Sequence, residues 1–230
     1  MKFLFILCFI GASVFAQDCP VGRSDYYCIT PEMAPESAVT ELDFYQIPMK
    51  IISLFQSELT ANNRSIFLDA QWRSPFLGAG VAPIGEKFRL MILGGLTRAP
   101  GFSLEAYAAV ICHELGHLIG GEPFQDYAGS TWASREGQSD YFAASTCLPR
   151  YFSSIGYLPD EIPALIEKAG YDFLASIKDF SSETRAQTLV RNYVQLPAVS
   201  QTLRAYPSVQ CRYETFRSPN SRSSCWYRPE

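Results

Sequence analysis

The segment His113-Glu114-Leu115-Gly116-His117 constrains this chain more than any other, because it contains both histidines of the 230-residue sequence. On an α-helix, residues i and i+4 lie on one face, so the two imidazoles can point at the same position. Glu114 directly follows the first histidine and can reach a water molecule held at that position. This arrangement suits a single Zn2+ ion, which takes two neutral histidine nitrogens, a third protein ligand and a water molecule.

The third ligand is predicted in a second helix that follows this motif. Glu136 lies nineteen residues after His117, and Asp140 lies one helical turn beyond Glu136. The run from Ser134 to Cys147 reads as a helix with Ser134 as its N-cap. Glu136 would complete a His2Glu zinc site, and Asp140 would accept a hydrogen bond from the N–H of a liganding histidine, fixing its tautomer.

The combination of H-E-x-x-H with a later E-x-x-x-D resembles the gluzincin clan of zinc metallopeptidases. Glu136-Gly137-Gln138-Ser139-Asp140 is most similar to soluble, secreted relatives of the CAAX prenyl proteases and to neutral zinc metallopeptidases. The resemblance covers Phe88 to Cys147 and implies His113, His117 and Glu136 as metal ligands, Glu114 as catalytic base and Asp140 as a support behind the ligands. An isolated H-E-x-x-H can arise by chance on an amphipathic helix, so the second helix carries much of the inference.

The start of the chain has the pattern of an export signal. Residues 1–16 combine Lys2, an apolar run and a small-residue cleavage site, which predicts a signal peptide and a secreted or periplasmic protein. Residues 17–36 read as an irregular, disulfide-linked segment, and residues 37–230 as one zincin-like domain. The net charge of −4 gives no reason to expect nucleic acid or an anionic membrane as a partner. We expect a monomer without a membrane span after cleavage, acting on a peptide or protein substrate.

Six cysteines remain after the predicted cleavage, and an even number in an exported chain favours disulfides. The simplest pairing joins near neighbours, Cys19 with Cys28 and Cys211 with Cys225, which leaves Cys112 with Cys147. The last pair would tie the two metal-bearing helices together. An alternative role is open for Cys19 or Cys28, either of which could reach the zinc as an inhibitory thiolate.

The remaining sequence predicts an α+β fold in which a small antiparallel sheet packs on the active-site helix and a mainly helical half follows. Apolar alternation predicts strands near 66–72 and 88–93, and the resemblance implies that Leu90 to Leu96 forms an edge strand that pairs with extended substrate. Ser103 caps the metal helix and Gly120-Gly121 ends it. Further helices are expected over Pro48–Leu59, Glu161–Ala169 and Glu183–Gln195.

The predicted function is hydrolysis of peptide bonds by a zinc-activated water molecule, with Glu114 as general base. The developing oxyanion needs a second donor, and no third histidine exists to supply it. The candidates that the sequence does not separate are Tyr193, Tyr206, Arg212 and Tyr213. Two other functions stay open, namely a zinc-stabilised binding or structural domain without turnover and hydrolysis of a non-protein amide.

Overall fold

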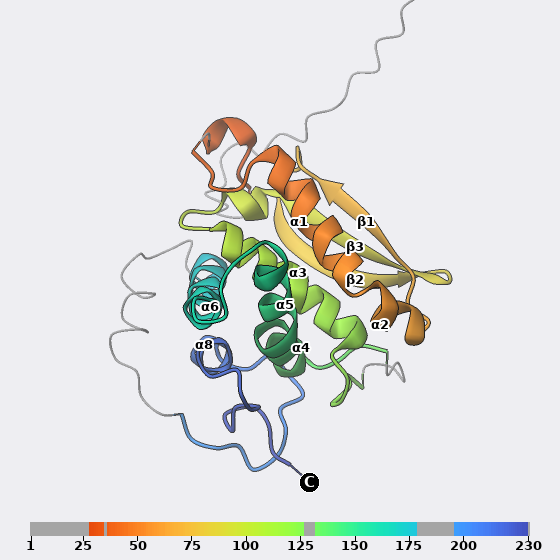
Figure 1. Ribbon diagram of the computed structural model, residues 1–230, viewed down its shortest axis with the longest axis vertical. Coiled ribbons are helices and arrows are strands. Elements are labelled where there is room, and N and C mark those ends of the chain that lie inside the picture. The colour runs from red at the N-terminus through yellow and green to blue at the C-terminus, as the bar shows by residue number, and fades with distance from the viewer. Residues whose placement is uncertain (1–27, 35, 127–131, 179–195, 230) are drawn as a thin grey trace, which may run out of the picture.

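The computed structural model describes residues 28–34, 36–126, 132–178 and 196–229, and it confirms the predicted α+β class. A three-stranded sheet lies on one side of a central helix, and most of the other helices lie on its opposite side (Figure 1). The predicted signal peptide, Cys19 and the predicted helix Glu183–Gln195 lie outside the described residues. Among the described helices, none has the length and apolar character that crossing a membrane requires.

The sheet is mixed, whereas the sequence analysis expected an antiparallel one. Strands β2 (Leu77–Ile84) and β3 (Lys87–Gly94) form an antiparallel hairpin whose turn contains Gly85 at φ +58°. Strand β1 (Ile66–Gln71) pairs with the other side of β3 in the parallel sense, giving the order β1-β3-β2. Strand β2 occupies one side of β3, and β1 pairs with the other side, where it runs parallel to β3.

The prediction that Leu90 to Leu96 forms an edge strand is wrong, because β3 is the central strand and is paired on both sides. It ends at Gly94, and a 3-10 turn, η2, follows over Gly95–Arg98. A Cβ on Gly94 would lie 1.9 Å from the carbonyl oxygen of Trp72, so the backbone approaches too closely for any side chain. The glycines at the strand end therefore serve backbone packing.

Helix α1 (Glu41–Leu54) begins seven residues before the predicted start at Pro48, which lies inside the helix. Thr40 and Asp43 form a capping box that outweighs the proline signal. Pro48 has no N–H, which leaves the Phe44 carbonyl without its helical donor. The Tyr107 hydroxyl fills that place with a hydrogen bond of 2.7 Å to the Phe44 oxygen. A short helix, α2 (Gln56–Ala61), continues the chain toward β1.

Helix α3 (Leu104–Ile119) carries the H-E-x-x-H motif through the centre of the molecule. Its predicted ends are confirmed, because the Ser103 hydroxyl accepts the Ala106 N–H and Gly121 adopts φ +80° after the last turn. Most of the helix is buried, with α1 and the sheet on one side and α4, α5 and α6 on the other. Ile111 and Leu115 are among its fully buried side chains.

The second metal-bearing helix begins later and continues further than predicted. Helix α4 (Glu136–Phe142) starts after Arg135, a π-helical turn follows over Ala143–Cys147, and α5 (Leu148–Ser154) continues without a break in the chain direction. Pro149 does not end the helix, because it occupies the first turn of α5, where its missing N–H is tolerated. Cys147 in the π-helical turn forms the predicted disulfide with Cys112 of α3.

Helices α6 (Ile162–Lys178) and α8 (Val209–Arg217) complete the C-terminal half. At the other end of the chain, a 3-10 turn, η1 (Pro31–Met33), precedes α1. Helix α6 passes through Gly170, where the sequence predicted an end. A Cβ on Gly170 would lie 2.3 Å from the Phe216 Cβ, so this glycine permits the close packing of α6 on α8. The predicted disulfide Cys211–Cys225 is also present and anchors the last segment to α8.

Candidate metal centre

His113, His117 and Glu136 come together as the sequence predicted. The Glu136 Oε2 atom lies 3.2 Å from His113 Nε2 and 3.7 Å from His117 Nε2. One ligand atom from each residue lies within 4.8 Å of the others, and the two imidazole rings are nearly perpendicular at 86°. All three side chains are buried, so the group forms an enclosed donor set of two nitrogens and a carboxylate oxygen.

The close crossing of α3 and α4 brings these ligands together, and a glycine makes the crossing possible. Gly116 lies between the two histidines and faces α4, where a Cβ would come within 2.9 Å of the Ser139 Cα. The i, i+4 spacing in α3 aligns the histidines on the helix face beside α4. Glu136 is the first residue of α4, so its carboxylate meets both imidazoles where the helices approach.

Hydrogen bonds at the Nδ1 atoms orient both imidazoles. His113 Nδ1 lies 2.8 Å from the Asp140 carboxylate, and His117 Nδ1 lies 2.8 Å from the Ser134 carbonyl oxygen and 2.9 Å from the Ser139 hydroxyl. A carbonyl oxygen can only accept, so His117 carries its proton on Nδ1. When each ring is neutral with its proton on Nδ1, the Nε2 atom that faces Glu136 is the one free to bind a metal, as in metal-binding histidines.

The Glu136 carboxylate gives a direct reason to place a cation here. Its Oε2 atom is buried and accepts no well-aligned hydrogen bond from the described residues, while Oε1 accepts a long one of 3.4 Å from Gln125. A buried carboxylate oxygen without a donor is costly unless a positive charge compensates it. Since both facing atoms are imidazole Nε2 atoms, which bind a metal when the ring is neutral, the three residues fit a bound metal ion.

Arg212 of α8 extends the site behind His113. Its Nε and Nη2 atoms donate to the two oxygens of Asp140 at 2.7 and 2.8 Å. Burial alone would raise the pKa of Asp140, but the charges and hydrogen bonds of Arg212 and His113 lower it to about 2. In the metal-free protein, burial opposes protonation of His113, but Asp140 and Glu136 outweigh it and raise the pKa of His113 to about 10. Asp140 therefore stays ionised and acts on His113 at neutral pH.

Glu114 and Tyr206 lie beside the ligands. Glu114 is half-buried on α3. Burial and the carboxylates of Glu136 and Glu114 raise the pKa of Tyr206, whose phenol is within hydrogen-bonding reach of Glu136 although the side chain as a whole is 65 % exposed. The Arg212 guanidinium carbon lies 5.7 Å from the centre of the Tyr206 ring. A neutral phenol and an acidic side chain thus accompany the donor set.

The other candidate oxyanion donors have different positions. Arg212 uses its Nε and Nη2 on Asp140, and the Tyr213 hydroxyl donates to Glu167 at 2.7 Å. Tyr193 lies outside the described residues. Arg212 was a candidate from the sequence, but its contact with Asp140 was not predicted, because 72 residues separate the two and no local pattern relates them.

The hypothesis of an inhibitory cysteine is not supported for Cys28. This residue is disulfide-bonded, buried and bridged to Phe76 beside the sheet, so it offers no thiolate to the metal centre. Its predicted partner Cys19 is not among the described residues.

Comparison with models of known protein families, with curated proteins and with solved structures found no match in any of the three. The function of this chain therefore has to be inferred from its own residues.

Proposed function

We propose that this chain is a secreted zinc-dependent metallopeptidase. The observation that carries the proposal is the meeting of two oriented imidazole nitrogens with a buried carboxylate oxygen that accepts no well-aligned hydrogen bond. Two nitrogens and one carboxylate oxygen match the His2Glu ligand set of catalytic zinc sites, which keep a fourth position for water or substrate. The reading as a gluzincin relative rests on the same residues together with Glu114 and Asp140.

When bound at these residues, zinc would polarise the scissile carbonyl and lower the pKa of a water molecule. Glu114 would accept the proton of that water during attack and deliver it to the leaving amine. Asp140 and the Ser134 carbonyl would hold the two imidazoles in place, so that the ligand geometry changes little during the reaction.

Tyr206 is the best candidate for the donor to the developing oxyanion. Of the four candidates from the sequence, Tyr206 is the one whose hydroxyl lies beside both Glu136 and Glu114 in the described part of the chain. Its raised pKa keeps the hydroxyl protonated at neutral pH, as a hydrogen-bond donor must be. Tyr206→Phe is expected to retain the metal and to lower turnover.

The substrate backbone would pair with β2, since β3 is already paired on both sides. Strand β2 is the edge that packs against α3, the helix that carries both histidines. Strand β2 has a neighbour in this sheet on one side only, so an extended peptide could pair with its other side.

A secreted location agrees with the two disulfides of the described residues, because disulfides persist in oxidising compartments. The signal-like pattern in residues 1–16 supports the same location.

A second function, a zinc-stabilised domain without turnover, is favoured by the burial of the ligands. His113, His117 and Glu136 are only 4, 8 and 7 % exposed, and closed metal sites are typical of structural zinc. Both functions require the bound metal, and they differ in whether Glu114 acts as a catalytic base.

The test measures zinc content and cleavage of a peptide library by the parent, by Glu114→Gln and by Glu86→Gln. Glu86 is exposed in the β2–β3 turn and serves as a matched control for the same chemical change. The peptidase proposal expects zinc in all three proteins and cleavage only by the parent and the control. Zinc without cleavage in all three would establish the structural alternative, and absence of zinc would refute both.

A further inference from the structure

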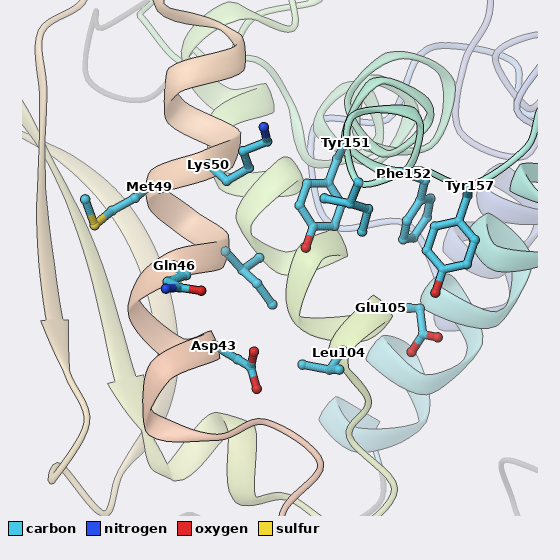
Figure 2. Close-up of a pocket in the computed structure, with 11 residues that line it drawn as sticks. Asp43, Gln46, Met49, Lys50, Leu104, Glu105, Tyr151, Phe152 and Tyr157 are labelled. Atoms are coloured by element: carbon cyan, nitrogen blue, oxygen red, sulfur yellow. The ribbon is translucent and has the colours of Figure 1, made fainter.

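A cavity of about 520 Å3 lies between α1, the start of α3 and the end of α5, and none of its lining residues belongs to the metal centre (Figure 2). Its volume is within the range of sites that bind small ligands or side chains. Ile47, Tyr151 and Phe152 form a buried floor. The cavity is therefore a preformed apolar hollow on a face that the proposed peptidase chemistry does not use.

The rim of this cavity exposes large apolar side chains to solvent. Met49, Leu104, Ile155 and Tyr157 are 62, 40, 47 and 40 % exposed, and all four line the same hollow. Single exposed apolar residues are ordinary, but a cluster around a concave surface is typical of an interaction site. An occupant with an apolar body would remove these side chains from water.

One end of the cavity is acidic. Figure 2 shows the carboxylates of Asp43 and Glu105 and the hydroxyls of Tyr151 and Tyr157 gathered at that end, with Lys50 directed toward the opposite end. Burial, with the nearby carboxylates of Asp43 and Glu105, raises the pKa of the Tyr151 phenol to about 12, so this hydroxyl stays neutral. The acidic end combines carboxylates with aromatic rings, the two groups that bind organic cations in proteins.

Lys168, which pairs with Glu105, does not neutralise this end fully. Lys168 Nζ lies 2.9 Å from Glu105 Oε2 and 2.8 Å from Asp172 Oδ2, so one ammonium group is shared between two carboxylates. Asp43 adds a further negative charge, and its Oδ2 accepts from the neutral Thr40. The balance of charge at this end is negative, which favours a cationic group in the occupant.

The cavity follows α1 for the length of a short peptide. Asp43 and Lys50 are seven residues apart, which corresponds to about 10 Å along a helix or three residues of extended chain. We propose that this cavity binds a peptide segment in which a lysine or arginine is flanked by apolar residues. The cationic side chain lies at the Asp43 and Glu105 end, and the apolar neighbours cover Ile155 and Met49.

The test uses acetyl-Leu-Lys-Leu-amide and the same peptide with ε-acetyl-lysine, which keeps the stem and removes the charge. Binding is followed by methyl NMR of methionine, with Met49 in the cavity as reporter and Met91 in the sheet as internal control. The full chain carries Glu114→Gln so that hydrolysis does not consume the probe. Because binding is measured without turnover, failure here is distinct from failure of the proposed peptidase function.

The charged peptide is expected to move the Met49 resonance and not that of Met91, and the acetylated peptide to bind about fivefold more weakly. Asp43→Asn, which keeps an oxygen for the Thr40 cap, is expected to weaken binding of the charged peptide only. Ile155→Lys is expected to abolish binding, and Leu158→Lys, a control at an exposed leucine outside the cavity, to leave it unchanged.

Three outcomes would overturn the proposal. Equal binding of the two peptides would remove the role of charge, and retained binding in Ile155→Lys would place the peptide elsewhere. No response of Met49 at millimolar peptide would show that the cavity is an ordinary surface hollow.

Discussion

The Asp140 carboxylate on α4 is 1 % exposed. It accepts hydrogen bonds from Arg212 of α8 and from His113 of α3, so it connects three helices. Asp140→Asn keeps the size of the side chain but removes its charge. It also turns one acceptor oxygen into an NH2 donor that faces the donors of the guanidinium. The substitution therefore leaves Arg212, itself only 6 % exposed, as a buried cation without its counter-ion.

The loss of stability can be bounded in two ways. Removing one partner of a buried ion pair typically costs about 3–5 kcal/mol of unfolding free energy. The fall of the Asp140 pKa from 3.8 to about 2 corresponds to about 2 kcal/mol, at 1.36 kcal/mol per pKa unit. The value from the pKa is smaller because a protonated aspartic acid still has two oxygens that can accept hydrogen bonds, whereas asparagine has one.

The pH dependence has a definite sign. The folded-state pKa of Asp140 is below the unfolded value, so the stabilisation is complete above about pH 4 and is lost as the pH falls toward 2. In the metal-free parent, part of the acid destabilisation over this range should come from Asp140. The asparagine variant should lack that part and be less stable already at neutral pH.

The assay is urea unfolding of chelator-treated protein, together with zinc affinity by competition. Asp140→Asn is expected to weaken zinc binding about 10- to 100-fold, because the Nδ1 partner of His113 loses its charge. Arg212→Met and the double variant complete a mutant cycle. If Asp140 and Arg212 act as one unit, Arg212→Met should cost much less in the asparagine background than in the parent. Additive losses within about 0.5 kcal/mol would refute the claim that they act together.

Three further substitutions test the contacts that position the site. Tyr107→Phe removes the donor to the carbonyl that Pro48 leaves open, and thermal unfolding should show a loss of about 1–3 kcal/mol. A methyl group in Gly116→Ala should push α4 away and lower both melting temperature and zinc affinity, whereas Gly80→Ala, with nothing within 4 Å of its Cβ, should leave both unchanged. Replacing Cys112 and Cys147 by alanine opens a loop of 35 residues, which the chain-entropy relation values at about 4 kcal/mol, and zinc affinity measured in parallel should also fall.

The metal-bearing residues could be located from the sequence because helical geometry is local. A four-residue spacing fixes which side chains share a face, so the pairs His113 with His117 and Glu136 with Asp140 needed no knowledge of the fold. The signals at Ser103 and Gly121 are local for the same reason, and both ends of α3 were predicted correctly.

The errors came from signals that depend on distant partners. Pro48 is a good helix start in isolation, but the Tyr107 hydroxyl supplies the missing donor from another helix and lets α1 continue. Strand β2 is absent from the strands that the sequence predicts, because it contains two glycines and Pro83, residues that an edge strand tolerates. The role of Arg212 depends on how α8 packs on α4, which no local pattern reports.

The C-terminal segment contacts the start of α4 on both sides of Glu136, at Arg135 and at Gly137. Arg135, the residue before Glu136, donates to the carbonyls of Thr202 and Leu203 at 3.3 and 3.4 Å. The indole of Trp226 covers Gly137 so closely that a Cβ there would lie 2.4 Å from the ring. The position of Glu136 therefore depends on residues far along the chain as well as on α3.

Because α4 supplies both Glu136 and Asp140, a displacement of α8 would change the ligand set through the Arg212 contact. The same coupling acts in reverse, since zinc bound between α3 and α4 would hold Asp140 in place for Arg212. Zinc should therefore slow amide hydrogen exchange in α8, although no proposed ligand lies on that helix. Slower exchange in α3 and α4 alone, with α8 unchanged, would show that the metal centre and the C-terminal segment open independently.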